Sequence, residues 1–204
     1  GAQTTMGTSF FGQADATSGG ANQGMTAPTR SSLNLPRGVA AVGKTLLVAD
    51  SRNNRVMIWN DDTVATGTAA DLVLGQTNFT TATPATVAAT SLSNPHSVGI
   101  SGMNTVVADT GNNRVMIYGK PITMNGQAAD SVVGQPSFAQ NQIATSPTLS
   151  ETELSSPLGL CADGNFVVTD TYANRVLIYP RVPLLHEDAP AFVLGQMNFT
   201  STQP

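Results

Sequence analysis

The chain has 204 residues, of which 40% are hydrophobic and only 11% charged, and its formal net charge is −4 at pH 7. A chain of this length can bury a substantial core in one or two domains. With two lysines and an acidic balance it lacks the clustered cations that phosphate backbones require, so nucleic acid is not an expected partner. No apolar run approaches the roughly 18 residues of a spanning helix, so membrane insertion is not expected either.

The N-terminal residues 1–9 are small and polar, and we expect them to be frayed. Gly1-Ala2-Gln3 has neither the basic start nor the apolar stretch of a secretion signal. The low charge and the abundance of Ser, Thr, Asn, Ala and Gly favour a β-rich extracytoplasmic protein, whether secreted, cell-surface or periplasmic. We therefore expect a mature or truncated chain whose signal peptide is absent.

Two apolar or aromatic residues followed by Gly-Gln occur four times, about 60 residues apart. The copies are Phe10–Gln13, Val73–Gln76, Val132–Gln135 and Val193–Gln196. A Phe stands three residues after the Gln in the last three copies, whereas the first copy has Ala16 there. Each copy predicts a short strand, the first being an extra leading strand at 10–13.

A long polar stretch follows each of the first three copies and ends in Leu-x-x-Pro. These endings are Leu33–Pro36, Leu92–Pro95 and Leu154–Pro157. Since proline cannot donate to a sheet ladder, it marks the entrance of a strand. Small residues such as Gly38 and Gly99 then predict a strand that neighbours approach closely. A tight turn comes next, as at Asp163-Gly164-Asn165.

A β-hairpin motif, written three times, forms the centre of each unit. The copies are Val48–Trp59, Val107–Tyr118 and Val168–Tyr179. Each consists of an apolar run, an Asp, a short polar turn, an Asn-Arg pair and a second apolar run, which together predict two antiparallel strands. A connector of about ten residues then leads to the Gly-Gln strand, and no segment shows a sustained helical period.

Four antiparallel strands per unit, repeated along the chain, are typical of β-propeller blades. The units span about 33–76, 92–135 and 154–196, within a single domain at 10–199 that is followed by a tail at 200–204. The fold prediction is therefore all-β, with three four-stranded blades per chain.

Pro36–Ala40 together with Leu47–Val56 resembles an NHL repeat, as does Asn104–Tyr118 and, less closely, Asn165–Tyr179. The Gly-Gln-x-x-Phe tail is similar to that of a bacterial subgroup of these repeats. The resemblance implies that the Asp-to-Arg turns share one face of the propeller with the long loops that join successive blades. Binding residues concentrate on loops that a rigid scaffold holds in place.

The Asp, Asn and Arg residues of the repeated turn are the candidate site residues. Two interpretations remain open: they fasten each blade through Asp–Arg pairs, with the Asp accepting N–H groups of the turn, or they form part of a ring on a binding face. Their repetition in every unit favours the first. They are Asp50, Asn54, Arg55, Asp109, Asn113, Arg114, Asp170, Asn174 and Arg175.

Catalytic groups are sparse, so we expect a protein that is not an enzyme and that needs no cofactor or metal. His96 and His186 stand at non-equivalent positions, and zinc sites need three or four ligands. Cys161, the single cysteine, excludes an internal disulfide and is expected to be a buried small hydrophobe. Glu187-Asp188 after His186 is expected to be a solvated charge run.

Three blades do not close a ring, because propellers typically have about four to eight. The chain is expected to be half of a six-bladed propeller completed by a second copy, or part of a longer repeat protein. The leading function is a binding module that recognises protein or glycan through the long-loop face. The alternatives are a metal-dependent propeller lyase or hydrolase and a self-assembling extracellular repeat.

Overall fold

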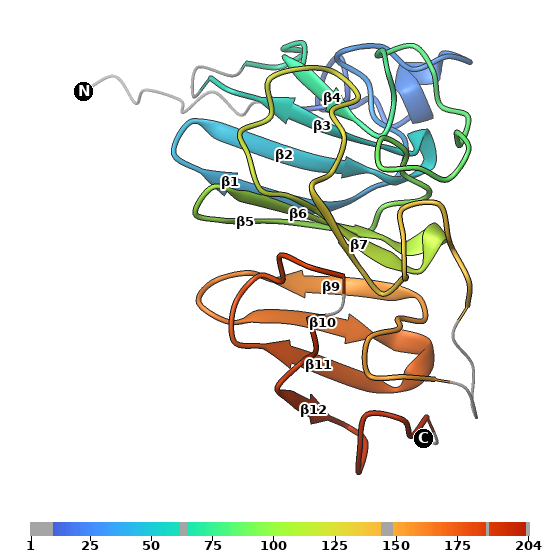
Figure 1. Ribbon diagram of the computed structural model, residues 1–204. Helices are drawn as coiled ribbons and strands as arrows, with labels where there is room; N and C mark the ends of the chain where they lie inside the picture. The colour runs from blue at the N-terminus through green and yellow to red at the C-terminus, as the bar shows by residue number, and fades with distance from the viewer. Residues whose placement is uncertain (1–9, 62–64, 144–148, 187, 203–204) are drawn as a thin grey trace.

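The computed structural model describes residues 10–61, 65–143, 149–186 and 188–202. Within them lie three four-stranded antiparallel sheets, each formed by consecutive strands in simple sequence order (Figure 1). We call them blade 1, blade 2 and blade 3. Blade 1 consists of β1 (Pro36–Val42), β2 (Thr45–Asp50), β3 (Arg55–Trp59) and β4 (Leu72–Leu74); blade 2 of β5 (Ser97–Ser101), β6 (Asn104–Asp109), β7 (Arg114–Tyr118) and β8 (Ser131–Val133); blade 3 of β9 (Pro157–Cys161), β10 (Phe166–Asp170), β11 (Arg175–Tyr179) and β12 (Phe192–Leu194).

The predicted fold class is confirmed: the chain is an all-β propeller segment of three blades. The hairpin motif forms the second and third strands of each blade, and its Asp and Arg are paired in register, as Asp109 and Arg114 are in blade 2. A single 3-10 turn joins the two strands in each blade: η2 (Ser51–Asn53), η3 (Thr110–Asn112) and η4 (Thr171–Ala173). One further 3-10 segment, η1 (Ala21–Gly24), lies in the N-terminal loop.

The blades pack face to face, so strand alternation sends every second side chain into the space between two blades. One apolar cluster joins blades 1 and 2 and includes Leu47, Ile58, Val107 and Met116. A second joins blades 2 and 3 and includes Val106, Ile117 and Leu177 among others. The first strands β1, β5 and β9 are neighbours across the blades.

Glycine permits the closest of these approaches. A Cβ atom on Gly38 of β1 would lie 2.6 Å from the carbonyl oxygen of His96 and 2.7 Å from the Cα of Ser97. Because the obstructing atoms belong to the backbone, a side chain at this position would push blades 1 and 2 apart. The prediction of a crowded first strand therefore holds at Gly38.

The three 3-10 turns and the long loops lie along one side of the stack, on the right in Figure 1. The turns that join the first and second strands of each blade (β1–β2, β5–β6 and β9–β10) lie along the other side. The structure therefore puts the Asp-to-Arg turns and the long loops on a common side, as the resemblance implied. No described helix has the length and apolar character needed to cross a membrane.

Two sequence expectations are wrong. Residues 10–13 do not form a strand, because β3 of blade 1 is already paired with β4 and no other described strand offers them a free edge. Cys161 is exposed and not buried, because it lies on the face of blade 3 that has no described blade beyond it. The expectations for residues 1–9, Glu187 and 203–204 concern positions outside the described residues.

Candidate binding face

Each Asp-to-Arg turn is built on a buried ion pair, seen clearly in blade 2. The Arg114 Nε donates to Asp109 Oδ2 over 2.7 Å, and both side chains are fully buried. The other guanidinium nitrogens donate to backbone carbonyls of the loops on either side: Phe138 at 2.5 Å, Ala88 at 2.9 Å and Ser91 at 3.0 Å. One arginine thus fastens the hairpin to the loop before the blade and to the loop after it.

Among the described residues, only N–H groups donate hydrogen bonds to Asp109. Its Oδ1 accepts the backbone N–H of Ser93 at 2.6 Å, and its Oδ2 accepts the Asn112 carboxamide at 2.8 Å beside the guanidinium of Arg114. Burial raises the pKa of the Asp109 carboxyl, while Arg114 and the N–H donors act in the opposite direction. A set composed of donors fits the ionised carboxylate.

The same arrangement occurs in blades 1 and 3. Arg55 donates to Asp50 at 2.7 Å, and Arg175 donates to Asp170 at 2.8 Å. Blade 3 differs at one position, since Ala173 stands where blades 1 and 2 have an asparagine that donates to the aspartate. Blade 3 therefore holds its carboxylate with fewer donors.

The expected Asx-type role of the aspartates is corrected by the geometry. The backbone N–H group that Asp50 accepts belongs to Asn34 in the preceding loop, at 2.6 Å, and not to the turn that follows. From that turn Asp50 accepts the Asn53 carboxamide, and it makes no capping bond to a backbone N–H of η2. The aspartates therefore tie the loop before each blade to the hairpin, a contact between residues far apart in the sequence.

The asparagines that precede the arginines end the 3-10 turns in the left-handed region, with φ of 53° at Asn54, 53° at Asn113 and 52° at Asn174. Asparagine adopts this conformation more readily than most residues. The Asn54 Oδ1 also accepts the backbone N–H of Asn94 at 2.8 Å, which links blade 1 to the entrance of blade 2. The Asn113 Oδ1 likewise accepts the backbone N–H of Ser156 at 3.0 Å, which links blade 2 to the entrance of blade 3.

The nine predicted site residues therefore form the framework of the face. The aspartates and arginines are buried in all three blades, and Asn174 is the one exposed member of the nine. The residue in the middle of each 3-10 turn is exposed on this side. These middle residues are Arg52, Gly111 and Tyr172.

Sequence reasoning passed over these three positions, although a signal was present. They differ in charge, size and polarity, while the residues around them repeat. Tyr172 is 71% exposed, which is unusual for an aromatic side chain on a rigid turn. Variation within a constant frame is the pattern expected of residues that determine specificity, and it applies to Arg52 and Tyr172. Gly111 has a steric cause, because a Cβ atom there would lie 2.7 Å from the Ser93 carbonyl oxygen.

A shallow hollow of about 460 Å³ lies beside Arg52, between turn η2 and the N-terminal loop. Its lining includes Gly19, Gly20 and Asn34. The small residues leave backbone groups accessible next to a cationic side chain, which suits a polar ligand.

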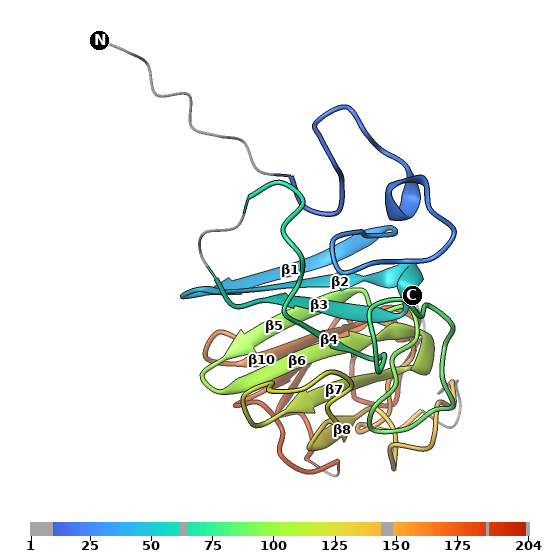
Figure 2. The ribbon, with the colours of Figure 1, turned by 90° about the horizontal axis from the view of Figure 1, so that it is seen from above.

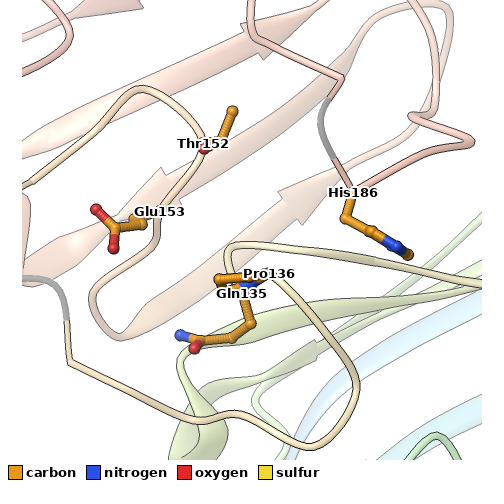
Figure 3. A pocket seen from close by; sticks show the side chains of 5 residues that line it. All are labelled: Gln135, Pro136, Thr152, Glu153 and His186. Carbon is orange, nitrogen blue, oxygen red and sulfur yellow. The ribbon is translucent and has the colours of Figure 1, made fainter.

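A second hollow, of about 230 Å³, separates the loops that follow blade 2 from the connector of blade 3 (Figure 3). It contains His186 and Glu153, but the two side chains point away from each other in the figure. The Glu153 Oε2 accepts the backbone N–H of Ser150 at 2.9 Å, and the His186 ring lies edge-on to Phe138. This hollow does not form a histidine–carboxylate pair.

His96 lies elsewhere, at the entrance to blade 2, with its Nδ1 3.3 Å from Arg37 Nη1 and its Nε2 3.2 Å from the Asn94 carboxamide nitrogen. Partial burial and the charge of Arg37 lower the pKa of His96. Within the described residues no three His, Cys, Asp or Glu side chains gather in a group that could hold a metal ion.

Comparison by sequence gives no match, whereas comparison by structure does. No protein-family model matches the chain, and no curated protein sequence matches it. Among solved structures, the chain is similar to one described as a streptogramin B lyase, with 12% identity and a TM-score of 0.45, over 85% of this chain and 43% of that one. The chain thus spans less than half the length of that structure, and the likeness concerns backbone arrangement alone.

Proposed function

We propose that the chain is a non-enzymatic binding module of the NHL-repeat type that recognises protein or glycan through the side bearing the 3-10 turns and long loops. One observation carries this proposal. Three turns with the same buried Asp–Arg framework present three chemically different exposed residues, Arg52, Gly111 and Tyr172.

The framework supports the proposal because it fixes the backbone from which these residues project. Each arginine reaches the loops on both sides of its turn, so the loops and the turn form one body. A binding surface that is already ordered loses less conformational entropy on association. An exposed tyrosine supplies contact area at low entropic cost, and an arginine adds charge and hydrogen-bond donors.

The extracytoplasmic and bacterial setting belongs to the same proposal. Its support is compositional: 11% charged residues, and long loops rich in Thr, Ser and Ala. The repeated Asp-x-x-x-Asn-Arg core and the Gly-Gln-x-x-Phe tail support the family, and the three-bladed structure is compatible with it.

A binding survey with matched variants tests the function. The probes are an array of polysaccharide fragments and a panel of purified secreted and cell-surface proteins. We expect at least one probe to bind the unaltered chain and a Met103→Ala control, whose substitution lies in the β5–β6 turn on the opposite side. The double variant Arg52→Ala/Tyr172→Ala should bind that probe about tenfold or more weakly, as loss of contact hot spots does. Absence of binding to every probe, or equal binding by the double variant, would refute the proposal.

A further inference from the structure

The outer face of blade 3 is an apolar surface with no described blade against it. Alternate residues of β10 and β11 are only half-buried, whereas their counterparts in blades 1 and 2 are buried. Leu194 is 55% exposed, whereas its counterparts Leu74 and Val133 are fully buried. We call this the blade-3 face; it comprises Cys161, Val167, Val176, Ile178, Phe192 and Leu194.

The opposite end of the stack, on blade 1, also has exposed residues whose counterparts in the other blades are buried. Val39 is 68% exposed, while Val98, at the same register position in blade 2, is 5% exposed because it packs on blade 1. Pro36 is exposed, whereas Pro95 and Pro157 are buried. We call this the blade-1 face; it comprises Leu35, Pro36 and Val39.

Each internal junction between blades uses the same pair of hydrogen bonds. A hydroxyl in the 3-10 turn donates to the proline carbonyl that opens the next blade: Ser51 to Pro95 and Thr110 to Pro157, each at 2.5 Å. A turn asparagine accepts the N–H of the residue before that proline, as Asn54 does from Asn94.

The two outer faces hold the separate halves of one more such junction. Blade 3 presents Thr171 and Asn174, both exposed, in the positions of Ser51 and Asn54. Blade 1 presents the N–H of Leu35 and the carbonyl of Pro36. Leu35 has a φ of 54°, and Asn94 and Ser156, its counterparts at the internal junctions, have 46° and 57°. The blade-1 entrance therefore already has the backbone conformation of a formed junction.

Residues 10–13 occupy the place that the fourth strand of a preceding blade would take. The Gly67 N–H donates to the Phe10 carbonyl at 3.2 Å, as the Gly126 N–H donates to the Val73 carbonyl at 2.8 Å. A Cβ atom on Gly12 would lie 2.7 Å from Leu33, as one on Gly75 would from Leu92. In Figures 1 and 2 the described part of the N-terminal loop, in dark blue, lies beside blade 1.

We propose that the blade-3 face of one copy docks on the blade-1 face of a second copy, and that two such junctions close a ring. Two copies of three blades give six, within the range of closed propellers. The partner is a second copy because its blade 3 supplies the matching hydroxyl, carboxamide and apolar surface.

For docking, residues 10–13 must move away from blade 1, so that Leu194, Gly195 and Gln196 of the neighbouring copy can occupy their position. β12 is the more firmly held segment, because it is paired with β11 at three positions. Phe10–Gln13 has no strand pairing. Two hydrogen bonds tie Phe10 to the blade-1 connector, the Gln13 carboxamide donates to the Gly20 carbonyl at 3.0 Å, and the Phe11 ring packs edge-on to Trp59 at 5.4 Å in an apolar cluster on blade 1. The N-terminal segment is therefore a removable cap on the blade-1 face.

A mixing experiment with two variants tests this pairing, and light scattering on a sizing column gives the mass. Phe192→Lys/Leu194→Lys alters the blade-3 face, and Val39→Lys alters the blade-1 face. All three residues are more than half exposed, so the variants should fold, as circular dichroism would verify. Met103→Lys, at a residue that is 67% exposed on the far side of the stack, is the control.

We expect the unaltered chain and Met103→Lys to have the mass of two copies. Each face variant alone should have the mass of one copy, with association weakened about 100-fold or more by the unpaired charges. An equimolar mixture of the two face variants retains one intact junction and should regain the mass of two copies.

Alkylation of Cys161 gives an independent readout, since this thiol lies on the blade-3 face. Its rate in Val39→Lys should fall when the blade-3 variant is added. An unaltered chain with the mass of one copy, face variants that remain paired, or a mixture that stays unpaired would each overturn the proposal. The mass and the binding survey are separate measurements on separate variants, so the association and the proposed binding function can fail separately.

Discussion

Each buried arginine of the repeated turn stabilises contacts between its blade and the adjoining loops. Arg114 binds Asp109 and three loop carbonyls without contact with solvent. By contrast, the Lys120–Asp130 pair, at 2.8 Å, leaves the lysine 76% exposed. Solvent screens such a surface pair, whereas removing one member of a buried pair strands the other charge.

Arg114→Ala is therefore expected to lower the free energy of unfolding by about 3–5 kcal/mol, because Asp109 would remain buried without its counter-charge. Urea unfolding followed by tryptophan fluorescence measures the change. Lys120→Ala is the matched control and should unfold close to the unaltered chain. Equal unfolding midpoints for the two variants would contradict the role assigned to Arg114.

A substitution at Tyr118 is expected to stabilise the chain. Its hydroxyl is fully buried and has no hydrogen-bond partner among the described residues, and burial raises the pKa of the phenol. Since an unsatisfied buried polar group costs about 1–3 kcal/mol, Tyr118→Phe should raise the melting temperature. A fall in melting temperature would show that the hydroxyl has a partner, such as a bound water molecule.

At the residue scale, the sequence predicted the Asp–Arg pairs because the two residues flank one short turn. It could not predict that Asp50 binds Asn34, since nothing local marks a contact across a loop. Nor could it predict the exposure of Cys161, which depends on whether another blade covers that strand.

At the scale of elements, the left-handed asparagines join turn geometry to the junctions between blades. Asn113 and Asn174 have almost equal φ values of 53° and 52°, and each carboxamide also donates to a loop carbonyl. They differ in burial and in one hydrogen bond, because Asn113 is buried and also accepts the N–H of Ser156 in the next blade. The pair therefore compares an asparagine at a formed junction with its counterpart at an open end.

Asn113→Ala should destabilise the chain by about 1 kcal/mol more than Asn174→Ala, because it leaves the Ser156 N–H without its acceptor. Both variants lose the same preference for the left-handed conformation, so that contribution cancels. Thermal unfolding of the two, at a concentration where the chain is a single copy, measures the difference. If both variants lost the same stability, the hydrogen bond between Asn113 and Ser156 would not contribute measurably to stability.

The strands themselves were predictable, because β-branched runs around short polar turns specify hairpins and their register. The error at Phe10–Gln13 is also physical. That motif forms a strand when a third strand of its own blade offers a free edge, as β7 does for β8. Phe10–Gln13 lies where such a strand would lie, but no described third strand is there to pair with it.

At the scale of the whole molecule, the repeat period gave the fold class, because a unit that cannot bury both of its faces must stack on its neighbours. The same argument explains the two outer faces. Their exposed valine, leucine and phenylalanine side chains are the ones that the internal junctions bury, and an uncovered surface of this kind favours association. The number of blades in the complete assembly is not encoded in any one unit.

The central claim is that the two ends of this three-bladed segment fit one another. Its most direct test is the solution mass of the unaltered chain, measured by light scattering across a range of concentrations. The account predicts the mass of two copies, with dissociation to one copy on dilution and no larger species, because a closed ring leaves no outer face. A mass of one copy throughout, or a series growing without limit, would contradict it.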